Sequence, residues 1–205
     1  METYYYEAYN RPNVHLVDLN ETPITTITEA GIETGDGERA FDIIVWATGF
    51  DGFTGALTRM DVVGEGGRVL RDQWARGVIT YLGAMVPGFP NFFMAGGPHL
   101  IAGNFPRATE IMVDYITGVL RYARTNGDTF VAPDSEACEA WTDEVHAAAT
   151  IALMAENSWF RGTNIPGKAH EYLAYAGSLT KFRERMDAMD EQGYPGIVFD
   201  TPVRA

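Results

Sequence analysis

The sequence has little cysteine, little positive charge and no long apolar run, and each shortage excludes a class of protein. Its single cysteine, Cys138, cannot form an intrachain disulfide, so we expect a reducing, cytoplasmic environment. Lys and Arg number 15 against 28 Asp and Glu, which gives a formal net charge of -13. Such a chain repels phosphate backbones and anionic lipid, so neither nucleic acid nor a membrane is an expected partner. The longest apolar run, residues 147–155, contains Thr150 and is too short to span a bilayer.

Several short motifs that carry chemistry are also missing. No Gly-x-Gly-x-x-Gly pattern follows an expected strand, so the usual loop that binds a dinucleotide pyrophosphate is absent. There is no Gly-x-Ser-x-Gly elbow, no Walker loop, no Cys-x-x-Cys pair and no pair of histidines at helical metal-ligand spacing. None of these signatures therefore explains the chain.

What the sequence does contain is typical of a folded α/β protein. Apolar residues make up 46% and charged residues 21% of 205 residues, enough for one ordinary domain with a sizeable core. Strand and turn signals dominate the first half and helical periodicity the second. The strand signals predict a β-hairpin over 24–37 and further strands at 14–19, 41–47, 78–82 and 91–97.

Three helices are expected in the second half, each with an apolar stripe at helical spacing. The first has Asn104 as a possible cap and ends at Asn126-Gly127. The second follows Asp134, another capping residue. We interpret the three stripes as core: Met112, Ile116, Val119 and Ala123; Ala137, Trp141, Val145, Ala148, Ala152 and Ala155; Leu179, Phe182, Met186 and Met189.

The first candidate site follows the run Phe41 to Ala47, whose nearly continuous apolar character suits a central strand covered on both faces. The run ends in Ala47-Thr48-Gly49, and small residues at the carboxyl end of a strand let a cofactor approach the backbone. A strand that simply ends in a glycine turn explains the same pattern equally well.

The second candidate is the stretch from Asn157 to Lys168. Trp159 offers an aromatic face and one N–H donor, while Asn164 and Lys168 can donate to a phosphate or an amide. Ligand contact is one interpretation. An ordered surface loop with Trp159 as its packing anchor is the other, and the pattern alone favours it slightly.

The third candidate is the stretch from Gly96 to Pro106, which leads into the start of the first long helix. A helix N-terminus favours anions and polarised carbonyls. His99 lies in this stretch and could act as a general base. A lone histidine without a visible partner is more often structural, and that is our expectation here.

Several short stretches, spread along nearly the whole chain, match the motifs of a known family in the same order. They are Tyr5-Tyr6-Glu7-Ala8-Tyr9-Asn10-Arg11-Pro12, Ala47-Thr48-Gly49-Phe50-Asp51, Tyr81-Leu82-Gly83, Gly88-Phe89-Pro90-Asn91 and Gly97-Pro98. The most specific is Ser158-Trp159 followed by Gly162-x-Asn164-x-Pro166-Gly167-Lys168. Together they resemble the Baeyer–Villiger monooxygenases, the family of phenylacetone and cyclohexanone monooxygenases.

The resemblance implies the fold: the C-terminal part of an α/β flavoprotein with two dinucleotide-binding domains, with strands in the first half and three main helices in the second. Residues 1–46 would end the nicotinamide domain and form a linker. Residues 47–205 would be the C-terminal part of the FAD domain with its helical segment and the Trp159 loop. The implied cofactors are FAD and NADP, and the implied reaction inserts oxygen next to a ketone, with the cofactors carrying the chemistry.

The resemblance also assigns roles to individual residues. Trp159 would contact NADP in a mobile loop that Asn164 and Lys168 order. Phe105 would face the flavin and the substrate pocket, although the loop before it is shorter than in some relatives. Asn104 and Lys168 would also belong to the cofactor-binding residues. Ala47, Thr48 and Gly49 would lie at the junction of the two cofactor domains.

The family's glycine-rich phosphate loops, its fingerprint motif and its catalytic arginine would all precede this sequence. We therefore expect a chain that is inactive alone, as a truncated gene product, a mis-called start or one half of a split enzyme with a companion N-terminal half. The alternatives are a fragment of a related flavin monooxygenase acting on amines or sulfides, and a non-catalytic remnant that binds a partner. The Gly-x-Asn-x-Pro-Gly-Lys pattern counts against the first alternative.

Overall fold

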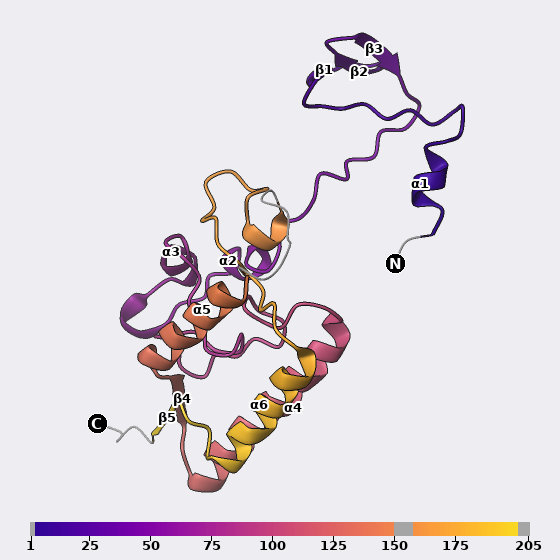
Figure 1. Ribbon diagram of the computed structural model, residues 1–205. Coiled ribbons are helices and arrows are strands. Elements are labelled where there is room, and N and C mark those ends of the chain that lie inside the picture. Colours follow the sequence, from indigo (N-terminus) through magenta and orange to yellow (C-terminus); the bar gives the residue numbers. More distant parts are fainter. Residues whose placement is uncertain (1–2, 150–157, 201–205) are drawn as a thin grey trace. The chain divides into compact units, whose positions relative to one another are not determined.

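A computed structural model describes residues 3–149 and 158–200, and the chain divides into two compact units, Met1–Thr48 and Gly49–Ala205 (Figure 1). The division lies within the Ala-Thr-Gly stretch, close to the expected boundary after residue 46. The assignment of the two parts to nicotinamide and FAD domains stays a prediction. Among the described helices, none is both long and apolar enough to cross a membrane.

The first unit contains a short helix, α1 (Tyr5–Ala8), and a small antiparallel sheet of three strands in sequence order. The predicted hairpin is confirmed as β1 (Ile24–Ile27) and β2 (Gly31–Thr34), and β3 (Gly37–Ala40) extends it. Every residue of β1 and β3 is exposed, so this sheet buries little apolar surface.

Two of the strands predicted in the first unit are wrong. Residues 14–19 are irregular, and so is the run 41–47, which should have been a central strand. Ile43 and Val45 of that run are 79% and 80% exposed. A strand requires a neighbour to pair its backbone N–H and C=O groups, and nothing in the described part of the chain pairs with this run as a β-ladder.

The second unit begins with short elements: α2 (Gly55–Thr58), η1 (Glu65–Gly67) and α3 (Leu70–Trp74). The predicted strands at 78–82 and 91–97 are also wrong, because this part of the chain forms buried loops joined by single bridges. Leu82 and Gly83 have positive φ angles of 55° and 72°, so the backbone turns sharply where the first strand would have continued.

Three long helices follow and confirm the helical prediction: α4 (Phe105–Asn126), α5 (Ser135–Ala149) and α6 (Leu179–Glu191). Asn104 caps α4 by accepting the Arg107 N–H at 3.2 Å, and Gly127 ends it with φ 80°. Asp134 Oδ1 accepts the Ala137 N–H at 3.0 Å at the start of α5.

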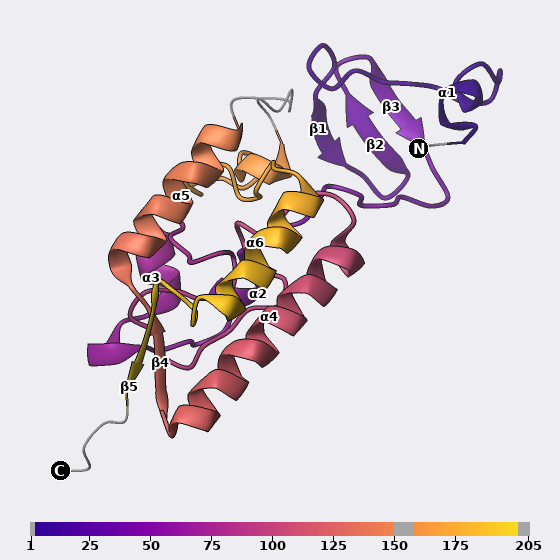
Figure 2. The ribbon, with the colours of Figure 1, turned by 60° about the horizontal axis from the view of Figure 1, so that its bottom comes forward.

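Three elements around the long helices were not predicted: one 3₁₀ turn and two strands. The 3₁₀ turn η2 (Trp159–Arg161) lies in the loop between α5 and α6. Strand β4 (Phe130–Pro133) links α4 to α5 and pairs antiparallel with β5 (Ile197–Asp200), which follows α6. The two views of the ribbon show this pair between the end of α4 and the start of α5, and α4 alongside α6 (Figures 1 and 2).

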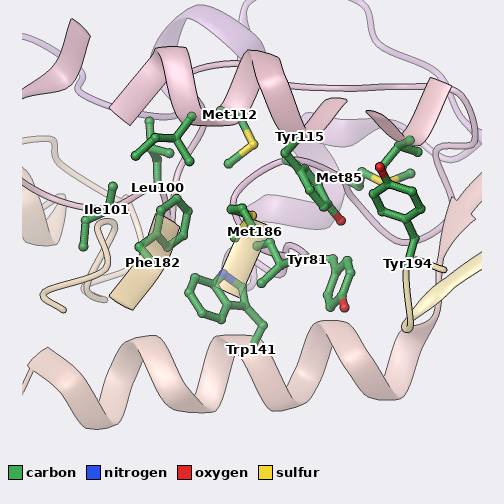
Figure 3. Packing of buried hydrophobic residues seen from close by; sticks show 14 of the residues in the cluster. Tyr81, Met85, Leu100, Ile101, Met112, Tyr115, Trp141, Phe182, Met186 and Tyr194 are labelled. Atoms are coloured by element: carbon green, nitrogen blue, oxygen red, sulfur yellow. The ribbon is translucent and has the colours of Figure 1, made fainter. Parts of the chain in front are cut away.

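The core of the second unit lies between these helices. Trp141 of α5 points toward α4 and α6, where Met112, Tyr115, Phe182 and Met186 are buried (Figure 3). Burying each such side chain contributes about 1.5–3 kcal/mol. The predicted stripes are therefore confirmed as core or as residues packed against it, except at Ala148, which is half-buried and not part of this cluster. Ala152 and Ala155 lie outside the described residues.

Candidate functional site

From Ser158 onward, the second candidate stretch folds as a compact loop, here called the Trp159 loop (residues 158–168), while Asn157 lies outside the described residues. Ser158 Oγ accepts the Phe160 N–H at 3.2 Å and caps η2. Thr163 Oγ1 accepts the Ser158 N–H at 2.8 Å and closes the loop on itself. Gly162 has φ 66°, and a Cβ there would lie 3.0 Å from Lys168 Cδ, so glycine permits both the turn and the close packing.

The Trp159 loop is fastened to the segment that follows the Ala-Thr-Gly stretch, more than a hundred residues earlier. Lys168 Nζ lies 2.6 Å from Asp51 Oδ1 and donates to the Gly52 carbonyl at 3.1 Å. Asn164 Nδ2 donates to the Phe50 carbonyl at 2.8 Å. The structure thus brings together two motifs that the sequence showed only separately.

Trp159 lies on the same segment. Its ring stacks on Phe53 at 5.2 Å between centroids and 15° between planes, and a Cβ on Gly52 would come within 2.6 Å of it. The residue nevertheless remains 46% exposed. One face of the indole is therefore a packing surface, as the anchor interpretation requires, while much of the ring stays accessible to a ligand.

The polar side chains of the loop have local acceptors. The Lys168 side chain is only 15% exposed, and Asp51 opposite it 22% exposed. Because Asn164 and Lys168 donate to backbone and carboxylate groups of residues 50–52, the geometry favours a role in holding the loop over direct contact with a phosphate. A direct cofactor contact by Lys168 stays a prediction.

Of the other predicted site residues, Gly49 lies beside the Trp159 loop, where a Cβ on it would be 3.6 Å from Asn164 Nδ2, and the rest lie elsewhere. The Asn104 side chain is engaged as the cap of α4. Phe105 begins that helix, is 55% exposed, and places its ring where a Cβ on Gly96 would be 2.7 Å away. Ala47 and Thr48 are exposed at the end of the first unit, whereas Gly49, with φ 95°, begins the second.

His99 is buried, with no exposed surface, as expected of a structural histidine. Its Nδ1 lies 3.0 Å from Thr80 Oγ1. Burial, and secondarily the proximity of His146, lowers the pKa of His99 to about 3. Sequence analysis did not single out His146 and Glu171, although both lie beside His99, because nothing in their spacing along the chain links them.

Known proteins resemble this chain, although no family model matches it. Over 96% of its length it is 40% identical to the cyclopentanone 1,2-monooxygenase of Comamonas sp. (strain NCIMB 9872). A phenazine N-monooxygenase of Lysobacter antibioticus is 36% identical over 95% of the chain. The chain spans only 36% of the length of each.

Solved structures give the same result. A closed cyclohexanone monooxygenase superposes with a TM-score of 0.92 at 37% identity, over 98% of this chain and 38% of that one. A structure of OTEMO in complex with FAD and NADP superposes with a TM-score of 0.85 at 37% identity, over 97% of this chain and 37% of that one.

These similarities show the class of protein: the chain corresponds to the C-terminal portion of an α/β flavoprotein monooxygenase. Within that class, the chain is related over nearly its whole length to the Baeyer–Villiger monooxygenases, of which it spans about a third (36%). The resemblance noted in the sequence is therefore confirmed.

Proposed function

We propose that this chain forms the loop-bearing C-terminal part of an FAD- and NADPH-dependent Baeyer–Villiger monooxygenase, which inserts oxygen next to a ketone and yields an ester or lactone. One observation supports this most strongly. The Ala47–Asp51 motif and the Trp159 loop, which both carry the resemblance, are joined by the Lys168–Asp51 ion pair and by the hydrogen bond from Asn164 to the Phe50 carbonyl. Trp159 also stacks on Phe53, just beyond the first motif.

The residues fit a nicotinamide dinucleotide at this place. Trp159 presents an accessible aromatic surface backed by Phe53, so its orientation is set before any ligand binds. Its indole N–H can donate to a ribose or amide oxygen. Phe105 supplies a second exposed ring, at the start of α4, for the flavin-facing role that the resemblance implies. Bound FAD and NADPH supply the redox chemistry, while this chain orients them.

The pyrophosphate groups of FAD and NADPH require a binding unit of another kind. Their usual binding unit is a glycine-rich loop between a strand and a helix, and this sequence contains none. We therefore assign the pyrophosphate contacts to the part of the relatives that this chain does not span, and propose that the chain alone is inactive and works with a companion segment on a ketone substrate.

The test is a chimera in which this chain replaces the aligned segment of the Comamonas cyclopentanone monooxygenase. We expect one FAD per chimera, NADPH oxidation that depends on added ketone, and a lactone product. The unmodified enzyme is the control, and phenazine is a second substrate arm. A chimera that holds FAD yet oxygenates no ketone would refute the proposal, and so would one that oxygenates only the nitrogen heterocycle.

A further inference from the structure

Three potential metal ligands from distant parts of the second unit converge beside a cleft. His99 lies in the loop before α4, His146 on α5, and Glu171 on the segment that leads from the Trp159 loop to α6. Each offers one ligating atom, and these atoms all lie within 4.8 Å of one another. His146 Nε2 is 3.8 Å from Glu171 Oε2, and the two imidazole rings lie 6.1 Å apart at 83°.

His99 supplies an independent reason to expect a ligand. Its Nδ1 is engaged by Thr80, while its Nε2, although fully buried, has no hydrogen-bond partner in the described chain. Leaving a buried polar atom unpaired destabilises the fold, so such an atom favours a bound partner. If Nδ1–H donates to Thr80 Oγ1, Nε2 carries the lone pair, which is the tautomer that a metal-binding histidine with such a supporting hydrogen bond presents.

Glu171, like His99, has one polar atom held by the fold and a second one that faces the cluster. Its Oε1 accepts the Val78 N–H at 2.8 Å, which fixes the carboxylate, while Oε2 is the oxygen nearest His146. The side chain is 14% exposed, against 43% for His146. One side of the cluster is thus embedded in the fold and the other is accessible.

The accessible side faces a cleft of 790 Å³ whose lining includes both His146 and Glu171. The same cleft contains Asp72, which would attract a cation, and Arg68 and Arg76, which would favour an anionic ligand on a bound ion. It gives an ion a route of entry and leaves space for water or a small anion to complete its coordination.

We propose that His99, His146 and Glu171 bind a divalent transition-metal ion, Zn²⁺ foremost, with three protein ligands and one open position toward the cleft. Two imidazoles and a carboxylate are ligands that Zn²⁺ accepts in tetrahedral geometry, at about 2.0–2.2 Å, which places ligand atoms about 3.4 Å apart. The distances of up to 4.8 Å between the ligand atoms therefore need to shorten by at most about 1.4 Å, within reach of small side-chain rotations.

Such an ion would connect α5, the loop before α4 and the segment after the Trp159 loop. It would stabilise the second unit by mass action, since the three ligands come together only in the folded chain. The proposal does not depend on the proposed monooxygenase function and can be tested on the chain by itself.

The experiment is titration of the purified, chelator-treated chain with ZnCl₂ in competition with a chromophoric chelator, followed by thermal melting. The chain has four histidines, so His15→Gln and His170→Gln serve as matched controls for His146→Gln. We expect one Zn²⁺ per chain with a Kd of about 10 µM or tighter, and a melting temperature that rises with zinc. Co²⁺ should give the visible absorption bands of a tetrahedral site.

His146→Gln and Glu171→Gln should weaken zinc binding at least about tenfold, and Thr80→Val about 10–100-fold through its hydrogen bond to His99. His146 is partly exposed, so its variant tests the ligand without the risk to folding that a change at His99 carries. Absence of zinc binding by the unaltered chain, equal binding by His146→Gln, or loss of binding in either control would overturn the proposal.

Discussion

At the scale of single residues, Trp159 combines two roles that the sequence left as alternatives. One face packs on Phe53, and the residue remains 46% exposed. A buried tryptophan costs about 3–5 kcal/mol of fold stability when it is removed. Because much of Trp159 is exposed, its replacement by alanine should cost less fold stability than that. The same replacement should weaken ligand binding by an amount that can be measured.

In the chimera with the Comamonas enzyme, we therefore expect Trp159→Ala to weaken NADP binding about ten- to a hundredfold while FAD is retained. The donor is worth about 0.5–1.5 kcal/mol and the lost contact area a similar amount. Trp159→Phe, which keeps the stack on Phe53, separates the two contributions. A collapse of melting temperature with unchanged affinity in the folded fraction would make Trp159 a packing residue only.

The Lys168–Asp51 pair gives a second prediction at this scale. The two side chains are largely buried and 2.6 Å apart, so each single variant, Lys168→Met or Asp51→Asn, should lower the free energy of unfolding by about 1.5–3 kcal/mol. In a double-mutant cycle measured by urea unfolding of the second unit, we expect a coupling energy of about 0.5–3 kcal/mol. A coupling energy near zero would mean that the pair does not hold the loop.

At the scale of elements, the start of α4 shows how a candidate binding residue can be structural. Asn104 accepts the Arg107 N–H, and this satisfies one of the free donors of the first helical turn. Its amide is therefore engaged in capping, whatever cofactor lies nearby.

We expect Asn104→Ala to destabilise the second unit by about 0.5–2 kcal/mol, because the cap is lost. Asn104→Ser should restore most of this stability, since serine caps nearly as well. The measurement is denaturant unfolding monitored by circular dichroism. If serine fails to rescue the loss, the role of Asn104 is not capping but some contact that requires the amide.

The long helices could be predicted because their signals are local. Caps at Asn104 and Asp134, the terminating Gly127 and the apolar stripes all lie within the elements that they define. Strands were predicted less well because pairing depends on distant segments: β5 pairs with β4 across the whole helical region, and the run 41–47 has no paired strand in the described chain. The contact between Asp51 and Lys168 is likewise long-range, so spacing alone could not reveal it.

In the molecule as a whole, the segment that joins the two units carries large apolar side chains that are mostly exposed to solvent. Ile43, Val45, Trp46 and Phe50 are between 64% and 86% exposed. Each exposed apolar side chain forgoes about 25 cal/mol for every Å² left unburied, so several of them in one short segment favour coverage by another protein segment. This agrees with a chain that spans only 36% of the length of its relative.

We therefore expect the isolated chain to self-associate at micromolar concentration and to bind a hydrophobic dye. The double variant Ile43→Lys with Val45→Lys should reduce both effects without lowering the stability of the second unit, because neither side chain belongs to its core. Analytical ultracentrifugation gives the association state. A monomer that binds no dye and melts sharply at high temperature would contradict the expectation.

We propose that this chain orients the cofactors while the rest of a relative's chain binds their pyrophosphate groups. The flavin content of two preparations, measured by absorbance after denaturation, distinguishes these two contributions. The account predicts no stoichiometric FAD in the chain purified alone after incubation with excess FAD, and close to one FAD per molecule in the chimera with the Comamonas enzyme. Close to one FAD per chain in the isolated protein would contradict it.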